Sequence, residues 1–275
     1  MTSDRDDRQQ LLSDFLTWVR QNESAGMQWF LADGAEPEPL PASPTAPESP
    51  AADDPFLAEC LDFVDRTLPL IAGQPARPEA RRSAQDKAKD LALLRQEVMP
   101  CTACALHEGR HTTVFGAGNP DAEVVFVGEA PGRDEDLQGE PFVGRSGQLL
   151  TKILGAIGYG RDDVFICNIL KCRPPNNRDP LPAEVAACEP HLKRQLAILD
   201  PKAICCLGRV AAQTLLGTDA SLKRLRETVH FYEGIPVMAT YHPAALLRNP
   251  GWKRETWNDV RKLRALVEAL RTGGA

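Results

Sequence analysis

The sequence of 275 residues lacks any apolar run near the roughly 20 residues that are needed to span a membrane. It also lacks an apolar stretch after its charged first residues, MTSDRDDRQQ, so no secretory signal peptide is indicated. These absences predict a cytoplasmic protein with no membrane partner. In that reducing compartment, the eight cysteines indicate metal ligands or buried thiols rather than disulfides.

The chain also lacks the net positive charge that is typical of nucleic-acid-binding proteins, since its formal net charge is −6. Residues 1–90 hold 17 acidic and 9 basic side chains, a balance of −8, which leaves +2 for the remainder. The acidity therefore belongs to the N-terminal part. The rest of the chain is neutral to weakly basic, which permits a DNA-binding face.

Residues 1–85 are predicted to form an acidic, Pro- and Ala-rich extension that is partly disordered. Seven prolines between positions 37 and 55 indicate a disordered or polyproline linker. Apolar residues at helical spacing predict short helices over 8–20 and 56–71. Because short isolated helices are marginal in water, a tail with transient helices is favoured. The alternative is an arm that docks a protein partner.

From residue 86 onward, short β-rich runs alternate with segments of helical periodicity. This alternation predicts a three-layer α/β/α domain over 86–275, with a central four-stranded, mainly parallel sheet. In such sheets the ligand binds beyond the carboxyl ends of the strands. The predicted strands are 122–128, 164–170, 202–208 and 236–242, and the predicted helices include 144–158, 182–199, 209–217 and 253–271.

Four cysteines have the spacing of a metal centre. Cys101 and Cys104 form a C-x-x-C pair, Cys172 ends the second predicted strand, and Cys188 lies in the following helix. Four thiolates can bind zinc or an iron–sulfur cluster, and the spacing alone does not separate the two. A C-x-x-C pair can also be redox-active or incidental. The other cysteines are predicted to be small buried apolar residues, namely Cys60, Cys167, Cys205 and Cys206.

The most informative segment is GEAPGRDEDLQGEPFVGRSGQLL, residues 128–150. A strand runs into a glycine-rich turn, and small residues let the backbone approach a flat ligand closely. A phosphate-cradling loop would carry basic residues and a Walker lysine, whereas this loop carries Glu129, Asp134, Glu135 and Asp136. An acidic, aromatic loop suits a neutral heterocycle better than a triphosphate.

Three motifs resemble the signatures of family 4 uracil-DNA glycosylases. They are the GEAPG and PFVG segments of 128–150, NILKCRPPNNR at 168–178 and HPAALLRNP at 242–250. The likeness covers roughly residues 90–272, and the four cysteines match that family's 4Fe-4S ligands. It implies an enzyme with the uracil-DNA glycosylase fold that flips deoxyuridine out of DNA and hydrolyses the N-glycosidic bond, which starts base excision repair.

The resemblance also implies roles for individual pocket residues. Phe142 stacks on the uracil ring, and the Asn168 amide pairs with uracil N3–H and O4, a pattern that cytosine reverses. His242 donates a hydrogen bond to uracil O2 as negative charge develops on the leaving base. Glu129 matches the family's first-motif acid, which positions the attacking water. Ala130, assigned to substrate binding, stands where other glycosylase families carry a water-activating aspartate, so the sequence indicates no strong general base.

Two further features concern selectivity and the reaction type. Glu135 is a plausible gate against the methyl group of thymine. No lysine occurs at the pocket positions, which predicts a monofunctional glycosylase without a Schiff-base lyase step. The cluster is expected to have a structural role, because Cys172 follows the strand end that carries Asn168.

The DNA contacts are predicted to lie after His242. Arg248, Lys253 and Arg254 are expected to grip phosphates, with Leu246 or Leu247 as a wedge in the base stack. The KRLR run at 223–226 is interpreted as a solvated face. The expected partner is uracil-containing DNA, single- or double-stranded, bound by a monomer that associates with the nucleoid.

Three alternatives stay open at this point. One is a related protein that binds uracil-DNA without turnover, although residues 173–179 contain no basic insertion that would indicate it. Another is a replication-associated iron–sulfur DNA-binding module without activity, which the presence of Glu129, Phe142, Asn168 and His242 disfavours. The last is a plain zinc-stabilised α/β domain.

Overall fold

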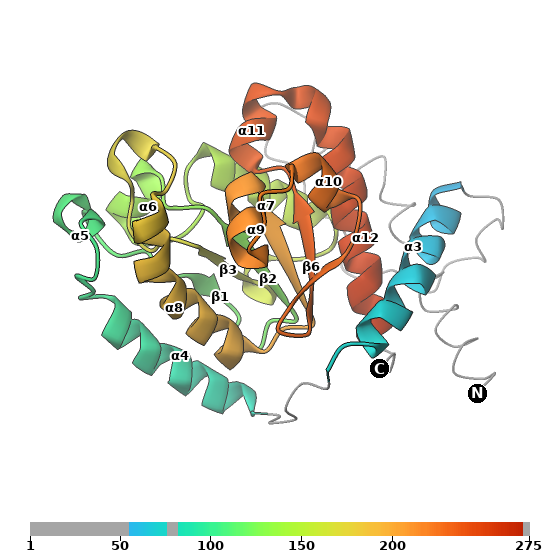
Figure 1. Ribbon diagram of the computed structural model, residues 1–275, viewed down its shortest axis with the longest axis horizontal. Coiled ribbons are helices and arrows are strands. Elements are labelled where there is room, and N and C mark those ends of the chain that lie inside the picture. The colour runs from blue at the N-terminus through green and yellow to red at the C-terminus, as the bar shows by residue number, and fades with distance from the viewer. Residues whose placement is uncertain (1–54, 76–81, 272–275) are drawn as a thin grey trace.

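A computed structural model describes residues 55–75 and 82–271 of the protein. Its central sheet has the order β1-β3-β2-β4-β6-β5, in which the four inner strands are parallel and the two outer ones antiparallel (Figure 1). The strands are β1 (Ala117–Gly118), β2 (Val124–Gly128), β3 (Phe165–Asn168), β4 (Ala203–Leu207), β5 (His230–Tyr232) and β6 (Ile235–Thr240).

The prediction of a mainly parallel α/β sheet is confirmed, and its four predicted strands are β2, β3, β4 and β6. The sheet has six strands rather than four, because β1 and β5 add short antiparallel edges. With two and three residues, these strands are too short to show a pattern of alternation in the sequence.

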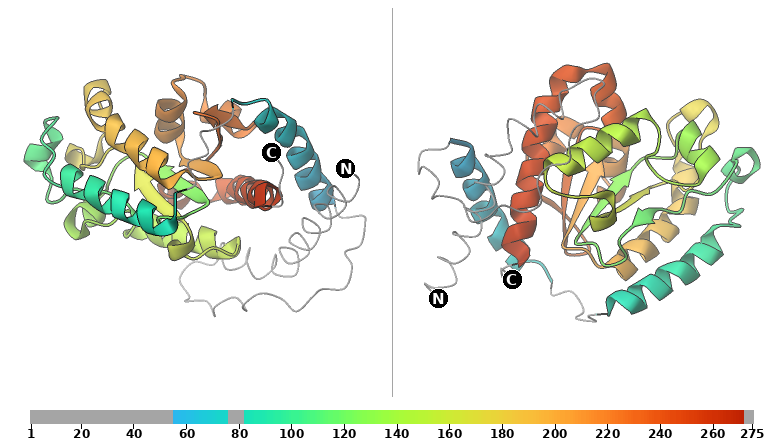
Figure 2. Two further views of the ribbon diagram at one scale, coloured as in Figure 1. Left: turned by 90° about the horizontal axis from the view of Figure 1, so that it is seen from below. Right: turned by 180° about the vertical axis from the view of Figure 1, so that it is seen from behind.

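Helices cover both faces of the sheet, which explains why every residue of the four inner strands is buried. Alternate strand residues point to opposite faces and form two separate cores. On one face α4, α8 and α9 pack on side chains such as Val125 and Cys206. On the other, seen from behind in Figure 2, α7 and α12 pack on side chains such as Phe126 and Cys205.

The five helices given predicted bounds within the described residues (56–71, 144–158, 182–199, 209–217 and 253–271) are present, and their bounds agree to within two residues. The helices are α3 (Pro55–Ala72), α4 (Ala84–Val98), α5 (Leu106–Gly109), α6 (Arg133–Gln138), α7 (Arg145–Ala156), α8 (Pro182–Leu199), α9 (Arg209–Leu216), α10 (Leu222–Arg226), α11 (Pro243–Arg248) and α12 (Lys253–Arg271). Short 3-10 turns are η1 (Arg161–Asp163), η2 (Pro175–Asn177) and η3 (Pro250–Trp252).

Helix α3, which the sequence places in the N-terminal extension, lies along α12 (Figures 1 and 2). Cys60 and Val64 are buried there against Ala265 and Ala269. The predicted helix at 8–20 and most of the predicted linker lie outside the described residues. Among residues 55–75 and 82–271, no helix is long and apolar enough to cross a membrane.

Candidate active site and cysteine centre

The loops that follow the parallel strands meet at one edge of the sheet and enclose a pocket of about 370 Å³. Six of the residues named from the sequence for substrate binding or catalysis line this pocket: Glu129, Ala130, Glu135, Phe142, Asn168 and His242. Strand β2 ends directly before Glu129, β3 ends at Asn168, and β6 ends two residues before His242. The expectation that ligand-binding residues follow strand ends therefore holds.

The ring of Phe142 is held in the pocket by an unusual backbone conformation. Its φ is +55°, a region that a bulky residue rarely adopts without support. Arg161 supplies that support, since its guanidinium donates to the carbonyls of Pro141 at 2.7 Å and Phe142 at 3.0 Å. A Cβ on Gly147 would lie 1.9 Å from the Phe142 carbonyl oxygen, so only glycine fits beneath this turn.

Asn168 is 2% exposed, and its Oδ1 has no hydrogen-bond partner among the described residues. A buried amide oxygen left unpaired in this way is destabilising, which makes it a candidate for binding a ligand donor. Gly128 is paired with Asn168 in the register of β2 and β3. A Cβ on Gly128 would lie 2.3 Å from Asn168 Oδ1, so the glycine leaves room for this side chain.

His242 caps the N-terminus of α11, because its Nδ1 accepts from the Ala244 backbone N–H at 3.1 Å. Burial lowers the pKa of His242 to about 4, and the positive charge of Arg248 adds to this effect. At neutral pH the imidazole is therefore uncharged and carries its proton on Nε2. Its ring lies 5.5 Å from that of Phe142, at an interplanar angle of 32°.

The pKa of the Glu129 carboxyl is shifted by its surroundings in the pocket. Burial raises the pKa of Glu129, the nearby Asp179 raises it further, and Arg209 opposes the shift. A carboxylate with a raised pKa is a better proton acceptor near neutrality. The neighbouring Ala130 contributes only its backbone and methyl group to the wall.

Glu135 lines the pocket, and backbone hydrogen bonds hold its carboxylate in place. Its oxygens accept from the backbone N–H groups of Gly132 at 3.1 Å, Val143 at 3.0 Å and Gly144 at 2.9 Å. The first bond caps the start of α6, and the other two tie α6 to the loop that carries Phe142. The side chain is therefore a fixed part of the pocket wall, and its role as a gate against the methyl group of thymine stays a prediction.

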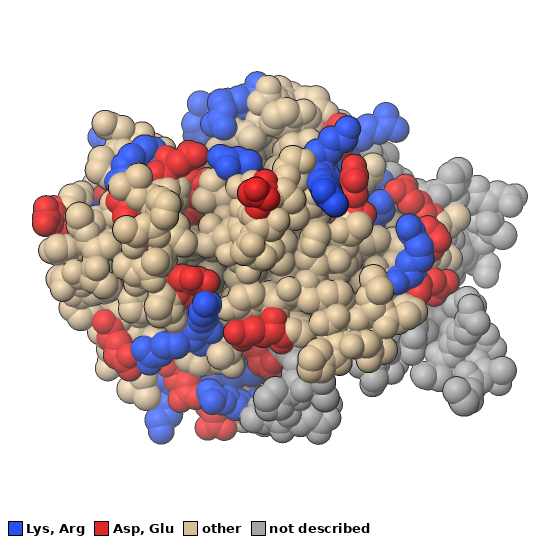
Figure 3. All heavy atoms as spheres, in the orientation of Figure 1, with Lys and Arg blue, Asp and Glu red and all other residues tan. Residues whose placement is uncertain are grey.

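The loop after His242 contains both exposed and buried residues. Arg248 and Arg254 are exposed, and basic side chains gather near α11 at the top of Figure 3. Lys253, in contrast, is only 6% exposed, so the expectation that it grips a phosphate does not fit the structure. Of the two candidate wedges, Leu246 is buried at 0% exposure, whereas Leu247 is 40% exposed.

Three planar side chains, of which Trp252 belongs to this loop, form a stack. The guanidinium of Arg226 lies 4.2 Å over the ring of Tyr241, and Tyr241 stacks on Trp252 with 4.6 Å between centroids. Arg226 is also bound to Asp259 through two nitrogens, at 2.7 and 3.1 Å. The last residue of the KRLR run is therefore structural, whereas Lys223 and Arg224 are exposed as expected.

The four predicted metal ligands line a single cavity that is separate from the substrate pocket. Cys172 lies four residues beyond Asn168, the last residue of β3, so it follows the strand rather than ending it. The remaining cysteines are buried, as predicted, at positions 60, 167, 205 and 206. The fold thus converges Cys101, Cys104, Cys172 and Cys188 and separates them from the rest.

Hydrogen-bond donors surround the sulfur atoms of this cysteine centre. Arg110 donates to Cys172 Sγ at 3.2 Å, the Lys171 backbone N–H donates to Cys188 Sγ at 3.2 Å, and His191 Nε2 lies 3.4 Å from Cys101 Sγ. Donors of this kind stabilise thiolates bound to a metal. Burial raises the pKa of Cys188 to about 11, so bound metal is needed to displace its proton.

The four convergent thiols are a donor set that fits either an iron–sulfur cluster or a structural zinc ion. Among the described residues, no group of three or more His, Cys, Asp or Glu side chains is already placed to hold a single metal ion.

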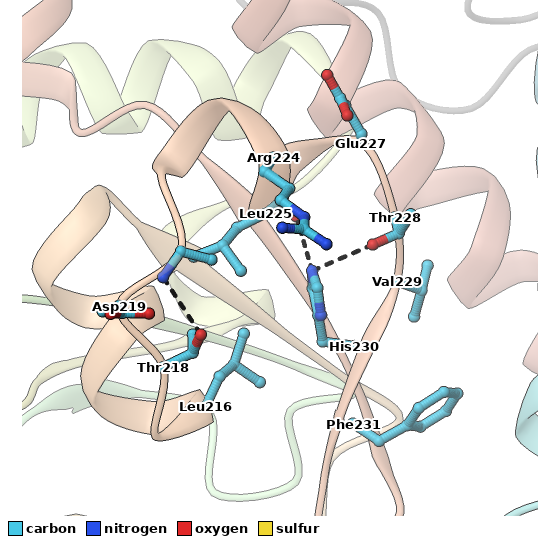
Figure 4. Close-up of a pocket in the computed structure, with 11 residues that line it drawn as sticks. Leu216, Thr218, Asp219, Arg224, Leu225, Glu227, Thr228, Val229, His230 and Phe231 are labelled. Carbon is cyan, nitrogen blue, oxygen red and sulfur yellow. Dashed lines mark hydrogen bonds between the residues drawn. The ribbon is translucent and has the colours of Figure 1, made fainter.

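A separate hollow of about 760 Å³ lies away from these residues, between α9, α10 and β5 (Figure 4). His230 points into it, but its Nε2 lies 3.0 Å from the Leu225 carbonyl oxygen and 3.2 Å from Thr228 Oγ1. None of the residues named from the sequence for catalysis or metal binding lines this hollow.

Sequence reasoning did not single out Arg161 or Lys171. Arg161 lies far from Phe142 in the sequence, so no local signal links them. Lys171 was detectable, because it is a charged residue inside an otherwise buried run, at 1% exposure. Burial lowers the pKa of Lys171, while the thiols of Cys167 and Cys188 raise it.

Comparison with known proteins places this geometry in context. A family model described as the uracil DNA glycosylase superfamily matches residues 115–261. A type-4 uracil-DNA glycosylase of Archaeoglobus fulgidus is 49% identical over 176 residues, which cover 61% of this chain and 88% of the relative. Type-4 enzymes of Thermotoga maritima and Sulfurisphaera tokodaii are 43% and 44% identical, over 64% of this chain each and over 94% and 84% of the relatives.

Proposed function

Because the chain belongs to the uracil-DNA glycosylase superfamily, we propose that it releases uracil from DNA by hydrolysing the bond between uracil N1 and deoxyribose C1′. It is a monofunctional glycosylase that starts base excision repair. Within the described residues no lysine lines the pocket, in keeping with hydrolysis rather than a Schiff-base step. The alternative of binding without turnover is not favoured, since the similar relatives are named as glycosylases.

Recognition rests on the unpaired amide oxygen of Asn168, the observation that carries the proposal. A uracil flipped from the stack lies against the ring of Phe142. Asn168 Oδ1 accepts from uracil N3–H, and the amide nitrogen donates to O4. Cytosine presents an acceptor at N3 and a donor at position 4, so both contacts would be repulsive.

The chemistry follows from the charge state of His242. The C1′–N1 bond breaks, and its electron pair leaves with uracil. Neutral His242 donates its Nε2–H to uracil O2, where negative charge develops. Glu129 orients a water molecule toward C1′; the water oxygen bonds to C1′, and its released proton passes to the Glu129 carboxylate and then to solvent.

The cysteine centre is proposed to hold a 4Fe-4S cluster on Cys101, Cys104, Cys172 and Cys188. When bound, the cluster supplies a covalent crosslink between the 101–104 loop, the segment after β3 and α8. Asn168 lies four residues before Cys172, so this crosslink shapes the pocket wall. The catalytic groups are the side chains of the pocket itself.

Uracil-containing DNA is the proposed partner, and the protein is proposed to act as a monomer in the cytoplasm, at the nucleoid. Arg248 and Arg254 are the exposed cations nearest the loop after His242, and they are proposed to contact phosphates. Leu247 is the exposed wedge that fills the gap left in the stack. Lys253 is not part of this proposal.

The test is uracil release from an oligonucleotide with a single deoxyuridine, detected by alkaline cleavage of the abasic strand. The purified holoprotein is expected to release uracil from single- or double-stranded substrate, and Asn168→Ala to reduce release by at least about 100-fold. Gln148→Ala, on the exposed face of α7, is the matched control and should act like the wild type. An intact strand with wild-type holoprotein contradicts the proposal.

A further inference from the structure

The ammonium group of Lys171 is buried beneath the strand end that reads the base. It donates to the backbone carbonyl of Asn168 at 2.8 Å and to Gln195 Oε1 at 2.5 Å. Gln195 in turn donates through Nε2 to the Phe115 carbonyl at 2.9 Å. Both acceptors of the ammonium are thus buried groups, and neither has water as a substitute partner.

The backbone of Lys171 is held as firmly as its side chain. Its N–H donates to Cys188 Sγ, and its carbonyl accepts from the Val114 N–H at 2.8 Å. Cys188 and Gln195 lie seven residues apart on α8, two helical turns, and therefore on the same face. Lys171 is bound to α8 at both points, between the cysteine centre and Asn168.

Burying a lysine is unfavourable, and an apolar side chain could fill the same space. Two properties of lysine are used at this position. It satisfies the Asn168 carbonyl, and it brings a positive charge to the wall of the cavity that the four cysteines line. A cluster with four thiolate ligands carries net negative charge, which a buried cation offsets.

We propose that Lys171 is a positioning residue that couples the cysteine centre to uracil recognition. Its ammonium fixes the Asn168 backbone, and with it the amide that meets the base, while its charge stabilises the reduced form of the cluster. The first part rests on the proposed function, because it concerns turnover. The second part rests on the proposed cluster, does not depend on turnover, and is tested separately.

The test compares the brown holoprotein with Lys171→Met, which keeps the apolar stem and removes the ammonium. We expect kcat for uracil release to fall by about 10- to 100-fold with a smaller change in KM. We also expect the reduction potential of the cluster to become more negative, because the reduced cluster loses a nearby cation. Iron content and folding are checked by metal analysis and circular dichroism.

Gln195→Leu separates position from charge, since it removes one acceptor of Lys171 and keeps the ammonium. It should lower kcat while leaving the potential close to that of the wild type, and it decides the positioning claim if Lys171→Met does not fold. Lys193→Met, on the exposed side of α8, is the control for charge and should change neither quantity.

Unchanged kcat in both folded variants overturns the positioning role, and an unchanged potential in Lys171→Met overturns the role of the charge. If Lys171→Met does not fold, Lys171→Gln replaces it in the potential measurement. A wild-type protein that releases no uracil refutes the proposed function instead, and the potential then still decides the second part.

Discussion

Gly128 and Asn168 are paired in the register of β2 and β3, and the Asn168 side chain occupies the space that a side chain on residue 128 would fill. A Cβ on Gly128 would meet Asn168 Oδ1 at 2.3 Å and Phe142 Cζ at 2.6 Å. This single glycine therefore lets the recognition amide and the aromatic ring approach each other. The shape of the pocket depends on the absence of a Cβ at residue 128 as well as on the side chains that line it.

Gly128→Ala should consequently reduce uracil release without removing any functional group. The added methyl displaces Asn168 and Phe142 by a substantial fraction of an ångström, and displacement of about 1 Å can lower activity by about 100-fold. The measurement is kcat/KM on a deoxyuridine oligonucleotide. Gly109→Ala is the matched control, because a Cβ there meets nothing within 4 Å. Equal activity of the two variants contradicts this account of the pocket.

Glu129 and His242 make separate contributions to the acid limb of the pH profile. The pKa of His242 lies at about 4, so the imidazole should cause no inflection near 6.5 in kcat. Burial raises the pKa of the Glu129 carboxylate, so its protonation should lower uracil release first as pH falls, and Glu129→Gln should remove that inflection. An inflection near 6.5 that persists in Glu129→Gln would show that the imidazole is charged in its working range. His242→Gln, which removes the imidazole, should reduce kcat by about 100- to 1000-fold at neutral pH.

The same residue links pH to stability. The folded-state pKa of His242, about 4, lies below the unfolded value of 6.5, so the unfolded chain takes up the proton first. The stabilisation is fully present above pH 6.5 and is lost as pH falls from 6.5 toward 4. Urea unfolding of wild type and His242→Gln at pH 7 and pH 5 measures it: the wild type should lose more stability between the two.

The parallel strands and the residues at their carboxyl ends were predictable, because short apolar runs alternate with amphipathic segments and the edge of such a sheet binds ligands. The local surroundings of individual side chains were not. Two of the three backbone hydrogen bonds to Glu135 come from Val143 and Gly144, and Lys253 is buried although lysine is usually exposed. Residue type alone predicts neither fact.

The metal centre illustrates the same limit. The spacing of the cysteines allows zinc or a cluster, and the structure adds that all four line one cavity. Arg161 shows the opposite situation, in which a residue with no motif of its own determines the conformation of Phe142. Contacts between segments far apart in the chain are the part of the site that residue patterns do not encode visibly.

Removal of one cysteine ligand should remove the colour of the protein. Cys188→Ala is expected to lose the visible absorption band and most of its iron, because three thiolates no longer hold the cluster. Cys60→Ala, at the α3–α12 contact, is the control and should keep both. One zinc per chain and a colourless wild-type protein would refute the cluster.

Arg161→Met should loosen the turn at Phe142. It removes two charge-assisted hydrogen bonds to backbone carbonyls, which is expected to lower the free energy of unfolding by about 1–3 kcal/mol. KM for deoxyuridine oligonucleotides should rise as well, since the stacking ring is no longer fixed. Arg66→Met, in an exposed pair with Asp62, should change stability by less than about 1 kcal/mol. A similar effect of both variants would show that the clamp is unimportant.

Salt dependence of DNA binding should distinguish the cations after His242. A protein that neutralises phosphates loses affinity with salt, by a slope of about 0.9 per contact in double-stranded DNA. Arg248→Gln and Arg254→Gln, at exposed positions, should each reduce that slope by about 1. Lys253→Gln should leave the slope unchanged and instead lower the melting temperature, because its side chain is buried. Fluorescence anisotropy from 50 to about 200 mM salt measures the slopes. A reduced slope for Lys253→Gln would show that this lysine contacts a phosphate despite its burial.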